Sequence, residues 1–409
     1  MKTVWEQRYA RRVQRMQGSA IRELLKITEL PGTISLAGGL PAPEIFPVEE
    51  IAVVAERVLK ENGQQALQYS ATEGYTPLRE LLAQRHSQHG LTLSLDNILI
   101  TSGSQQGLDL LAKIMIDTGD RLVVESPTYM GALQACNSYE PEYLAVRSDE
   151  EGIVTAELEP ALEQNPKFIY ALPNFQNPTG VTFTLERRQQ LVQMAGRYGV
   201  PIIEDDPYSQ LRFEGEPLPS LLALENERQM AGTDGPYDGN VVQLNTFSKV
   251  LAPGLRLGWV VAPTEVIRKL VLAKQGADLH TTTFNQMIAY ELTRQGFLEE
   301  HITLIRQTYR ERRDTMLAAL EEYFPDTVHW TRPQGGMFLW LTLPEGVDAA
   351  HLLTDALEYR IAFVPGAAFH PSGGGNNTIR LSFSNATPER IEEGIRRLGK
   401  LLHARMLRA

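Results

Sequence analysis

Residues 241–262, VVQLNTFSKVLAPGLRLGWVVA, indicate the fold class of this chain. Two apolar, strand-like runs, 241–245 and 257–262, flank a connection that contains Pro253 and Gly254. The connection has about a dozen residues, close to the shortest length of a parallel crossover, which usually contains a helix. The second run is therefore predicted to lie antiparallel to the first. Lys249 stands in the connection, just beyond the end of the first run.

Upstream of this segment, short apolar runs alternate with helical patterns such as 105–116 and 185–198. This alternation is typical of an α/β fold with a mostly parallel sheet. Seven strands are predicted, at 98–101, 121–125, 142–146, 168–172, 200–204, 241–245 and 257–262.

The rest of the chain differs in pattern, and its 409 residues suggest more than one domain. Residues 1–65 are helical apart from the Gly/Pro-rich stretch AGGLPAPEIFP. Residues 66–284 contain the sheet. Residues 285–409 combine a long helical pattern with strand-like pieces at 336–343, 362–364 and 378–384, which predicts a smaller α/β domain.

Composition argues against several classes of function. The net charge is −11, whereas binding a nucleic acid requires a surplus of Lys and Arg on one face. Cys136 is the only cysteine, so neither an intrachain disulfide nor a cysteine-based zinc site is expected, and a cytoplasmic location fits. The charged N-terminus does not resemble a signal peptide. The sequence contains no uninterrupted apolar run of about eighteen residues, so no membrane span is predicted.

Polar residues follow the predicted strands, where ligands bind in parallel α/β sheets. Ser102 and Ser104 follow the first strand and open a helix, which makes an anion site, although either could simply cap that helix. Tyr129 follows the second strand and could lie against an aromatic ligand or merely pack. Asn177 lies in a turn after the fourth strand and could donate a hydrogen bond to a ligand oxygen.

Asp205 follows the fifth strand, where a buried carboxylate is costly unless it is paired. A pyridinium N–H is a suitable partner, and Tyr208 could reach the phenolic oxygen of the same ring. The alternatives are a solvated acidic turn or a metal site made by Asp205 and Asp206.

Lys249 is placed where a desolvated amine could react with an aldehyde, since burial and nearby cations expose its nucleophilic form. A surface charge is the alternative. Ser248 and Arg256 would add donors for a phosphate. Arg380, in the apolar run TIRLSFS (378–384), needs a partner, either a substrate carboxylate or a core acid.

Taken together, these segments and their order along the chain match the binding site of a single ligand. Tyr69 and the segments TSGSQQ (101–106), SPTYMG (126–131), QNPTG (176–180), DDPY (205–208), SKVLAPGLRLG (248–258) and IRLSFS (379–384) resemble the fold-type-I pyridoxal-phosphate (PLP) aminotransferases of class I/II. The resemblance covers nearly the whole chain. It implies PLP as cofactor and amino transfer between an L-amino acid and a 2-oxo acid such as 2-oxoglutarate, in ping-pong fashion through pyridoxamine phosphate.

The resemblance also implies a role for each matching residue. Lys249 would hold PLP covalently and move the substrate proton, Asp205 would bind the pyridine N–H, and Tyr129 would stack on the ring. Asn177 and Tyr208 would bind the phenolic oxygen. The phosphate would be held by Ser104, Gln105, Ser248 and Arg256, supported by Thr246.

Substrate and subunit contacts follow in the same way. Arg380 would bind the substrate α-carboxylate, helped by Asn177 and the backbone of Gly39. Tyr69 would reach into the phosphate site of a neighbouring subunit, which implies a homodimer with shared active sites.

The N-terminal part resembles one subgroup more closely. SAIRELLKIT (19–28), SLAGGLPAPEIFP (35–47) and LQYSATEGYTPLRE (67–80) are similar to the 2-aminoadipate and kynurenine/aminoadipate transaminases. That implies a mobile N-terminal lid helix in segment 1–65, which packs on the small domain, with Arg22 meeting a distal substrate carboxylate and Ser19 nearby. A solvated helix face is the alternative for Arg22. The expected substrates are 2-aminoadipate and glutamate, with room under a flexible lid for leucine-like or aromatic amino acids.

Two other functions are compatible with parts of the pattern. A PLP-dependent lyase or synthase of the same fold would use the same lysine and aspartate, and formation of glutamate from 2-oxoglutarate would discriminate. A regulator with an aminotransferase-like sensor domain would carry an N-terminal DNA-binding domain, for which the pattern starting near Ser19 leaves no room.

Overall fold

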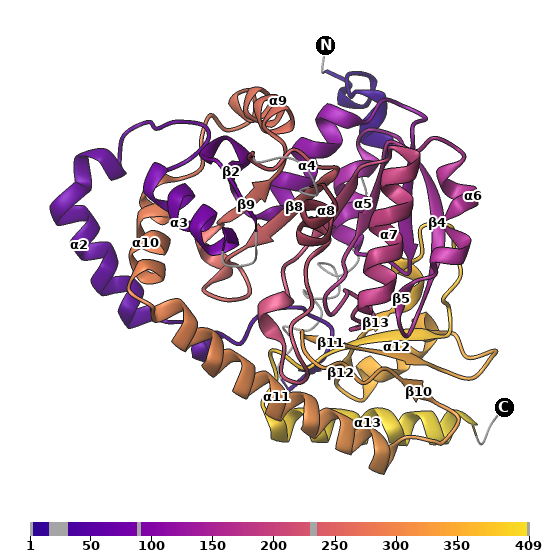
Figure 1. Cartoon of the computed structure of the whole chain (residues 1–409). Helices are drawn as coiled ribbons and strands as arrows, with labels where there is room; N and C mark the ends of the chain where they lie inside the picture. The colour runs from indigo at the N-terminus through magenta and orange to yellow at the C-terminus, as the bar shows by residue number, and fades with distance from the viewer. Residues whose placement is uncertain (1–2, 16–31, 88–90, 230–234, 407–409) are drawn as a thin grey trace.

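The computed structural model describes residues 3–15, 32–87, 91–229 and 235–406 (Figure 1). Its central sheet has eight strands in the order β2-β9-β8-β7-β6-β3-β4-β5. They are β2 (Ile98–Thr101), β3 (Arg121–Ser126), β4 (Glu142–Asp149), β5 (Gly152–Ile153), β6 (Phe168–Ala171), β7 (Ile202–Asp205), β8 (Val241–Thr246) and β9 (Gly258–Val261).

The pairing of these strands confirms the mostly parallel sheet. Strands β4, β3, β6, β7 and β8 pair in parallel, whereas β9 is antiparallel to both β8 and β2. The antiparallel direction predicted for residues 257–262 is therefore correct. The predicted number of strands was wrong by one, because β5 was missed. This strand has two residues and returns from β4 through a turn ending at Gly152, whose φ is 109°, so it is too short to give a periodic pattern.

Helices cover both faces of the sheet (Figure 1). On β3, Val123 belongs to one apolar cluster, whereas its neighbours Leu122 and Val124 belong to another. Side chains of a strand alternate between faces, so both faces are buried, as parallel sheets require. The covering helices are α7 (Leu185–Tyr198) and α8 (Leu221–Gln229) on one side, and α4 (Ser104–Met115), α5 (Met130–Asn137) and α9 (Thr264–Gln275) on the other.

The C-terminal part forms a second, antiparallel sheet with the order β10-β11-β14-β13. Its strands are β10 (His329–Trp330), β11 (Phe338–Thr342), β13 (Val364–Pro365) and β14 (Thr378–Ser382). The long helices α11 (Phe297–Tyr323) and α13 (Pro388–Met406) lie side by side below it (Figure 1). Helix α12 (Ala349–Glu358) precedes β12 (Ile361–Ala362).

The single strand predicted at 362–364 is divided in the structure. Strand β12 pairs in parallel with β1 (Ile34–Ser35), and β13 pairs with β14 instead. Phe363 lies between the two pairings and is fully buried. One apolar run therefore contributes strands to two sheets, and its sequence alone does not reveal where the partner strand changes.

A helical layer flanks the β2 edge of the large sheet (Figure 1). It consists of α2 (Val48–Ala66), α3 (Thr76–Ser87) and α10 (Thr283–Arg294), which contact one another. Within the described ranges, no helix is long and apolar enough to cross a membrane.

Candidate active site

A cavity of about 690 Å³ lies beyond the carboxyl ends of the parallel strands. Residues of the N-terminal segment, the large sheet and the small sheet meet there. The sequence-predicted residues that line it are Gly39, Ser104, Gln105, Tyr129, Asn177, Asp205, Tyr208, Thr246, Ser248, Lys249, Arg256 and Arg380. Ser19 and Arg22 lie outside the described residues.

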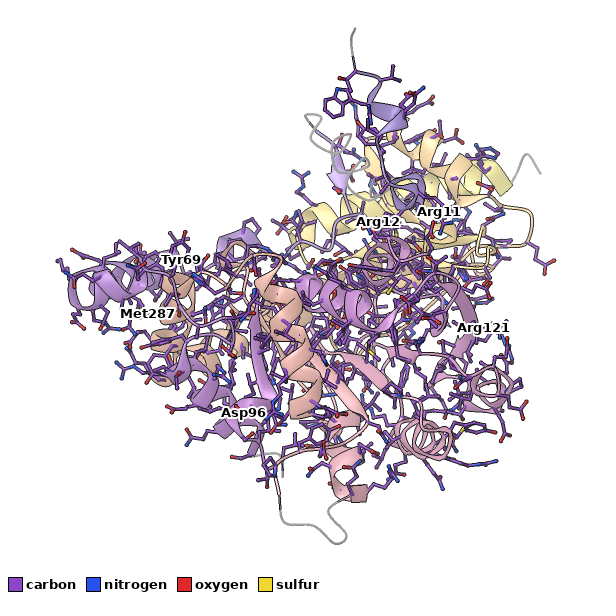
Figure 2. All side chains as sticks on the ribbon, turned by 90° about the horizontal axis from the view of Figure 1, so that it is seen from above. Arg11, Arg12, Tyr69, Asp96, Arg121 and Met287 are labelled. Carbon is purple, nitrogen blue, oxygen red and sulfur yellow. The ribbon has the colours of Figure 1, made fainter. Side chains whose placement is uncertain are left out.

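Tyr69 is the predicted site residue that the structure keeps apart from this cavity. Its side chain is 78% exposed, on the helical layer formed by α2, α3 and α10 (Figure 2). Its ring makes an edge contact with His280, with 6.0 Å between the ring centres. Within one chain it contributes nothing to the cavity wall.

Lys249 projects into the cavity from the turn that follows β8. Its Nζ donates a hydrogen bond to the backbone oxygen of Gly39 at 3.1 Å. The side chain remains partly accessible through the cavity, but protein atoms surround it. This desolvation, together with the charges of Arg380 and Arg256, lowers the pKa of Lys249 to about 8. At this pKa about a tenth of the amine is unprotonated, and so nucleophilic, at pH 7.

Asp205 is the last residue of β7 and is 2% exposed. Burial raises the pKa of this carboxyl to about 7, against a lowering effect of the hydrogen bond from Tyr170. The Tyr170 hydroxyl donates to Oδ2 at 2.8 Å. Oδ1 is buried and has no hydrogen-bond partner among the described residues. A buried acceptor of this kind is costly unless a ligand donates to it.

Arg380 lies on β14 with a side chain that is 1% exposed. Its Nη1 donates to Asn177 Oδ1 at 2.8 Å, and its Nη2 donates to the Ala37 backbone oxygen at 2.6 Å. The guanidinium also lies over the rings of Phe338 and Phe369, at 4.4 and 5.1 Å from their centres.

Charge balance at Arg380 points to an anionic ligand. Burial lowers the pKa of Arg380 to about 10, so the group stays protonated at neutral pH. Among the described residues no carboxylate forms an ion pair with it. The alternative of an ion pair with a core acid is therefore not found among the described residues. A carboxylate that accepts two hydrogen bonds is the ligand that fits the arginine fork.

The opposite end of the cavity resembles an anion cradle. Ser104 begins α4, so its helix N-terminus carries free N–H groups and a partial positive charge. Gly103 has a φ of 84°, and a Cβ there would lie 2.6 Å from Arg256 Nη2. The hydroxyls of Thr246 and Ser248 lie 2.9 Å apart on the same side. Backbone N–H groups, hydroxyls and a guanidinium thus converge, as a phosphate requires.

A polar cluster around the buried Lys274, which the sequence did not reveal, supports this cradle. Lys274 Nζ donates at 2.8 Å to Gln106 Oε1 and to both oxygens of Asp278. Gln106 Oε1 accepts the Ser102 N–H at 2.8 Å, and Asp278 accepts the Ser102 hydroxyl at 3.2 Å. Ser102 is thereby held by the protein itself. Lys274 lies in the amphipathic helix α9, where a lysine in the sequence is normally interpreted as a solvent-exposed charge.

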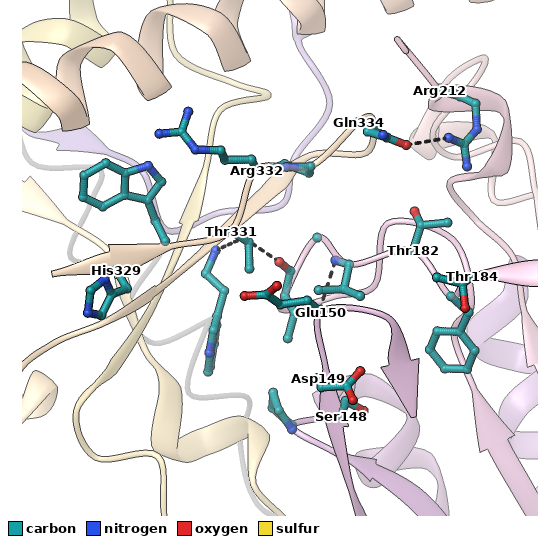
Figure 3. Close-up of a pocket in the computed structure, with 18 of the residues that line it drawn as sticks. Ser148, Asp149, Glu150, Thr182, Thr184, Arg212, His329, Thr331, Arg332 and Gln334 are labelled. Atoms are coloured by element: carbon teal, nitrogen blue, oxygen red, sulfur yellow. Dashed lines mark hydrogen bonds between the residues drawn. The ribbon is translucent and has the colours of Figure 1, made fainter. Parts of the chain in front are cut away.

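A second cavity, of about 900 Å³, lies between the 179–184 segment and strands β10 and β11 (Figure 3). Its two lining arginines already have partners within the protein. Arg212 donates to Gln334 at 3.2 Å and lies 4.8 Å from the Phe175 ring centre, and Arg332 pairs with Glu321. Despite its smaller volume, the first cavity has the uncompensated Arg380 and the unpartnered Asp205 oxygen. We therefore assign the candidate site to the first cavity.

Comparison with known proteins gives consistent matches over the full chain. The family model "Aminotransferase class I and II" matches residues 39–398. The 2-aminoadipate transaminase of Thermus thermophilus is 47% identical, over 97% of each chain. The aromatic-amino-acid aminotransferase 1 of Thermococcus litoralis is 45% identical, over 98% of this chain and 95% of its own. The structure of α-aminoadipate aminotransferase from Thermus thermophilus, complexed with N-(5'-phosphopyridoxyl)-L-leucine, has a TM-score of 0.92 at 45% identity and covers 100% of both chains.

Proposed function

The chain belongs to the class I and II aminotransferases and is a PLP-dependent transaminase, and on this premise we propose which substrates it uses and which residues act. The amino donors proposed are 2-aminoadipate and glutamate, with leucine-like and aromatic amino acids as further substrates, and the acceptor is a 2-oxo acid such as 2-oxoglutarate. Relatives named for 2-aminoadipate and for aromatic amino acids support this range. A lyase or synthase of the same fold is not favoured by these relatives.

The observation that carries the proposal is the distribution of charge in the cavity. A cationic cradle lies at one end, Arg380 lies without a carboxylate partner at the other, and Lys249 lies between them. A phosphorylated aldehyde and an α-carboxylate would together neutralise both ends. The buried oxygen Oδ1 of Asp205 fits the protonated ring nitrogen of PLP, because it lacks a donor among the described residues.

PLP, when bound, supplies the aldehyde that takes up the amino group and a ring that accepts electrons from the substrate Cα. We propose that Lys249 holds it, that Asp205 accepts the ring N–H, and that Tyr129 packs on the ring. Asn177 and Tyr208, which both line the cavity, would bind its phenolic oxygen. The phosphate would lie in the cradle of Ser104, Gln105, Thr246, Ser248 and Arg256.

The chain's own part in the reaction is to orient the substrate and to move one proton. Arg380 would fix the α-carboxylate by charge-assisted hydrogen bonds, with Asn177 and the Gly39 backbone beside it. Lys249 Nζ, with a pKa of about 8, can both take a proton from the substrate Cα and return it at neutral pH. Asp205 would keep the ring nitrogen protonated.

Selectivity for an acidic side chain requires a further cation. The arginines and lysines that line the described cavity are Arg256, Lys249 and Arg380, and each already has a proposed role. We propose that Arg22, with Ser19 nearby, meets the distal carboxylate from the N-terminal segment.

Arg22→Ala should lower kcat/KM for 2-aminoadipate and glutamate by about 10- to 100-fold, the range of one charge-assisted contact. Leucine should be converted as before, because it has no distal charge. The measurement is the half-reaction rate for each amino acid, followed by the absorbance of the bound cofactor. Arg12→Ala, at another exposed arginine of the N-terminal segment, is the matched control. Equal losses for glutamate and leucine would show that Arg22 has no role in selectivity.

We further propose a homodimer in which Tyr69 completes the phosphate site of the partner subunit. Supporting this, Leu67, Tyr69 and Leu279 are 74%, 78% and 53% exposed near one another, which is unusual for large apolar side chains of a monomer. Sedimentation equilibrium should give about twice the mass of one chain, and a monomer mass for the active holoenzyme would contradict the proposal.

We also propose that the enzyme works in the cytoplasm. Its single cysteine, Cys136, is a buried free thiol, which fits a reducing compartment. Cell fractionation tests this location directly.

A further inference from the structure

Tyr170 occupies a position on β6 that links the hydrophobic core to the candidate site. It pairs in register with Ile203 of the neighbouring strand β7, two residues before Asp205. Its ring is 2% exposed and belongs to the apolar cluster beneath α4 and α9. Only its hydroxyl leaves that apolar environment, to donate to Asp205 Oδ2 at 2.8 Å.

We propose that Tyr170 is a positioning residue that holds the Asp205 carboxylate ionised and oriented, so that Oδ1 remains available for the ring N–H of PLP. This inference rests on the proposed role of Asp205. It goes further, because it assigns to a core residue, outside the cavity wall, control over the protonation of the cofactor ring.

The geometry leaves Asp205 dependent on this one contact. Among the described residues, the Tyr170 hydroxyl is the only hydrogen-bond donor to the carboxylate, and Oδ1 has no partner. A carboxylate with a single donor at Oδ2 presents the other oxygen in a fixed direction. Without that donor, both oxygens would compete for the ring N–H, and the side chain would be free to rotate.

The hydrogen bond from Tyr170 opposes the effect of the surroundings on the pKa of Asp205. Burial and the neighbouring Asp206 raise the pKa of Asp205, and the Tyr170 hydrogen bond lowers it. Burial, together with Asp205, Tyr129 and Glu125, raises the pKa of Tyr170 well above its usual value, so it donates throughout the physiological range. A donor that stabilises the ionised carboxylate keeps the shared proton on the ring nitrogen rather than on Asp205.

The test replaces the hydroxyl and reads the ring nitrogen directly. Holoenzyme is reconstituted with PLP labelled with ¹⁵N in the ring, and its ¹⁵N chemical shift is followed from about pH 5 to about pH 10, a range that brackets the perturbed groups. In Tyr170→Phe the ring nitrogen should lose its proton at a pH about one unit lower than in the wild type, the size expected for one hydrogen bond to a charged group. The kcat value should fall roughly tenfold while KM changes by less than about twofold, because the contact matters when the ring accepts electrons.

Tyr237→Phe is the matched control. Tyr237 is also a buried tyrosine, 3% exposed, and its hydroxyl donates to the Val241 backbone oxygen at 2.8 Å, away from the cavity. The variant loses that bond and the one that the hydroxyl accepts from the Val241 N–H at 2.9 Å, and it does not touch Asp205. The ¹⁵N titration and kcat should stay as in the wild type.

Two further variants make the result decisive. Site-specific 3-fluorotyrosine at position 170 keeps the shape and strengthens the donor, so it should shift the titration in the opposite direction even if Tyr170→Phe fails to fold. Asp205→Asn should move the ring nitrogen toward the unprotonated form. If Asp205→Asn does so but neither Tyr170 variant moves the titration, the inference is overturned and the proposed role of Asp205 stands. If Asp205→Asn also has no effect, both are overturned.

Discussion

Lys249→Ala should abolish transamination and the visible absorbance of the bound cofactor together. The side chain is proposed both to hold PLP and to move the Cα proton, and removing a group with two roles in one reaction typically costs on the order of 10⁵-fold in kcat. Lys269→Ala, at an exposed lysine on α9, should leave both properties unchanged. The measurements are the absorbance spectrum of the reconstituted protein and the yield of glutamate from 2-oxoglutarate. A variant that keeps the spectrum and turnover would remove Lys249 from the mechanism.

Stability measurements on a second variant, Lys249→Met, can separate loss of chemistry from loss of fold. The folded-state pKa of Lys249, about 8, lies below its ordinary value of 10.5. Burial of the ammonium therefore costs stability, and this cost is fully present below about pH 8 and disappears as the pH rises toward 10.5. The apoprotein of Lys249→Met should accordingly gain stability relative to the wild type below about pH 8, and should lose that advantage at higher pH.

Arg380→Ala should raise KM for every amino-acid substrate and lower kcat/KM by about 10³-fold, because a buried, bidentate charge pair is lost. The effect should fall mainly on KM, since the α-carboxylate is held both before and during the reaction. Arg380→Lys keeps the charge without the fork and should recover only part of the loss.

Arg212→Ala provides a control of similar chemistry. Arg212 also lies over a phenylalanine ring and forms hydrogen bonds, but it lines the second cavity (Figure 3). Steady-state kinetics with glutamate and leucine should show little change for Arg212→Ala. Comparable losses in the two arginine variants would mean that Arg380 acts through stability and not through the substrate.

Much of the architecture was predictable because it depends on local patterns. The alternation of apolar runs and helices indicated the parallel sheet, and the short connection around Pro253 indicated the reversal of β9. The strand order was not predictable, since it depends on pairings between distant segments. Strand β5 and the change of partner at Phe363 were missed because each involves only one or two residues.

The cavity-lining residues were predictable for a related reason. Polar residues that follow buried strands are conspicuous in the sequence, and such strand ends share one edge of the sheet. The roles of Tyr170 and Lys274 were not predictable. An aromatic residue inside a strand and a lysine in an amphipathic helix are both ordinary, so neither residue stands out in the sequence. Only the folded chain shows that the Tyr170 hydroxyl contacts Asp205 and that the Lys274 amine contacts Gln106 and Asp278, which hold Ser102.

The contacts around Arg380 also bear on the entropy of substrate binding. Its guanidinium is already held by Asn177, the Ala37 carbonyl and two aromatic rings before any substrate arrives. Ordering a long side chain on binding usually costs about 0.5–1.5 kcal/mol. Here that ordering is completed during folding, so every amino acid meets the same rigid receptor for its α-carboxylate. Differences in affinity between substrates should therefore arise where the substrate side chain binds, from the ordering of the groups that meet it there.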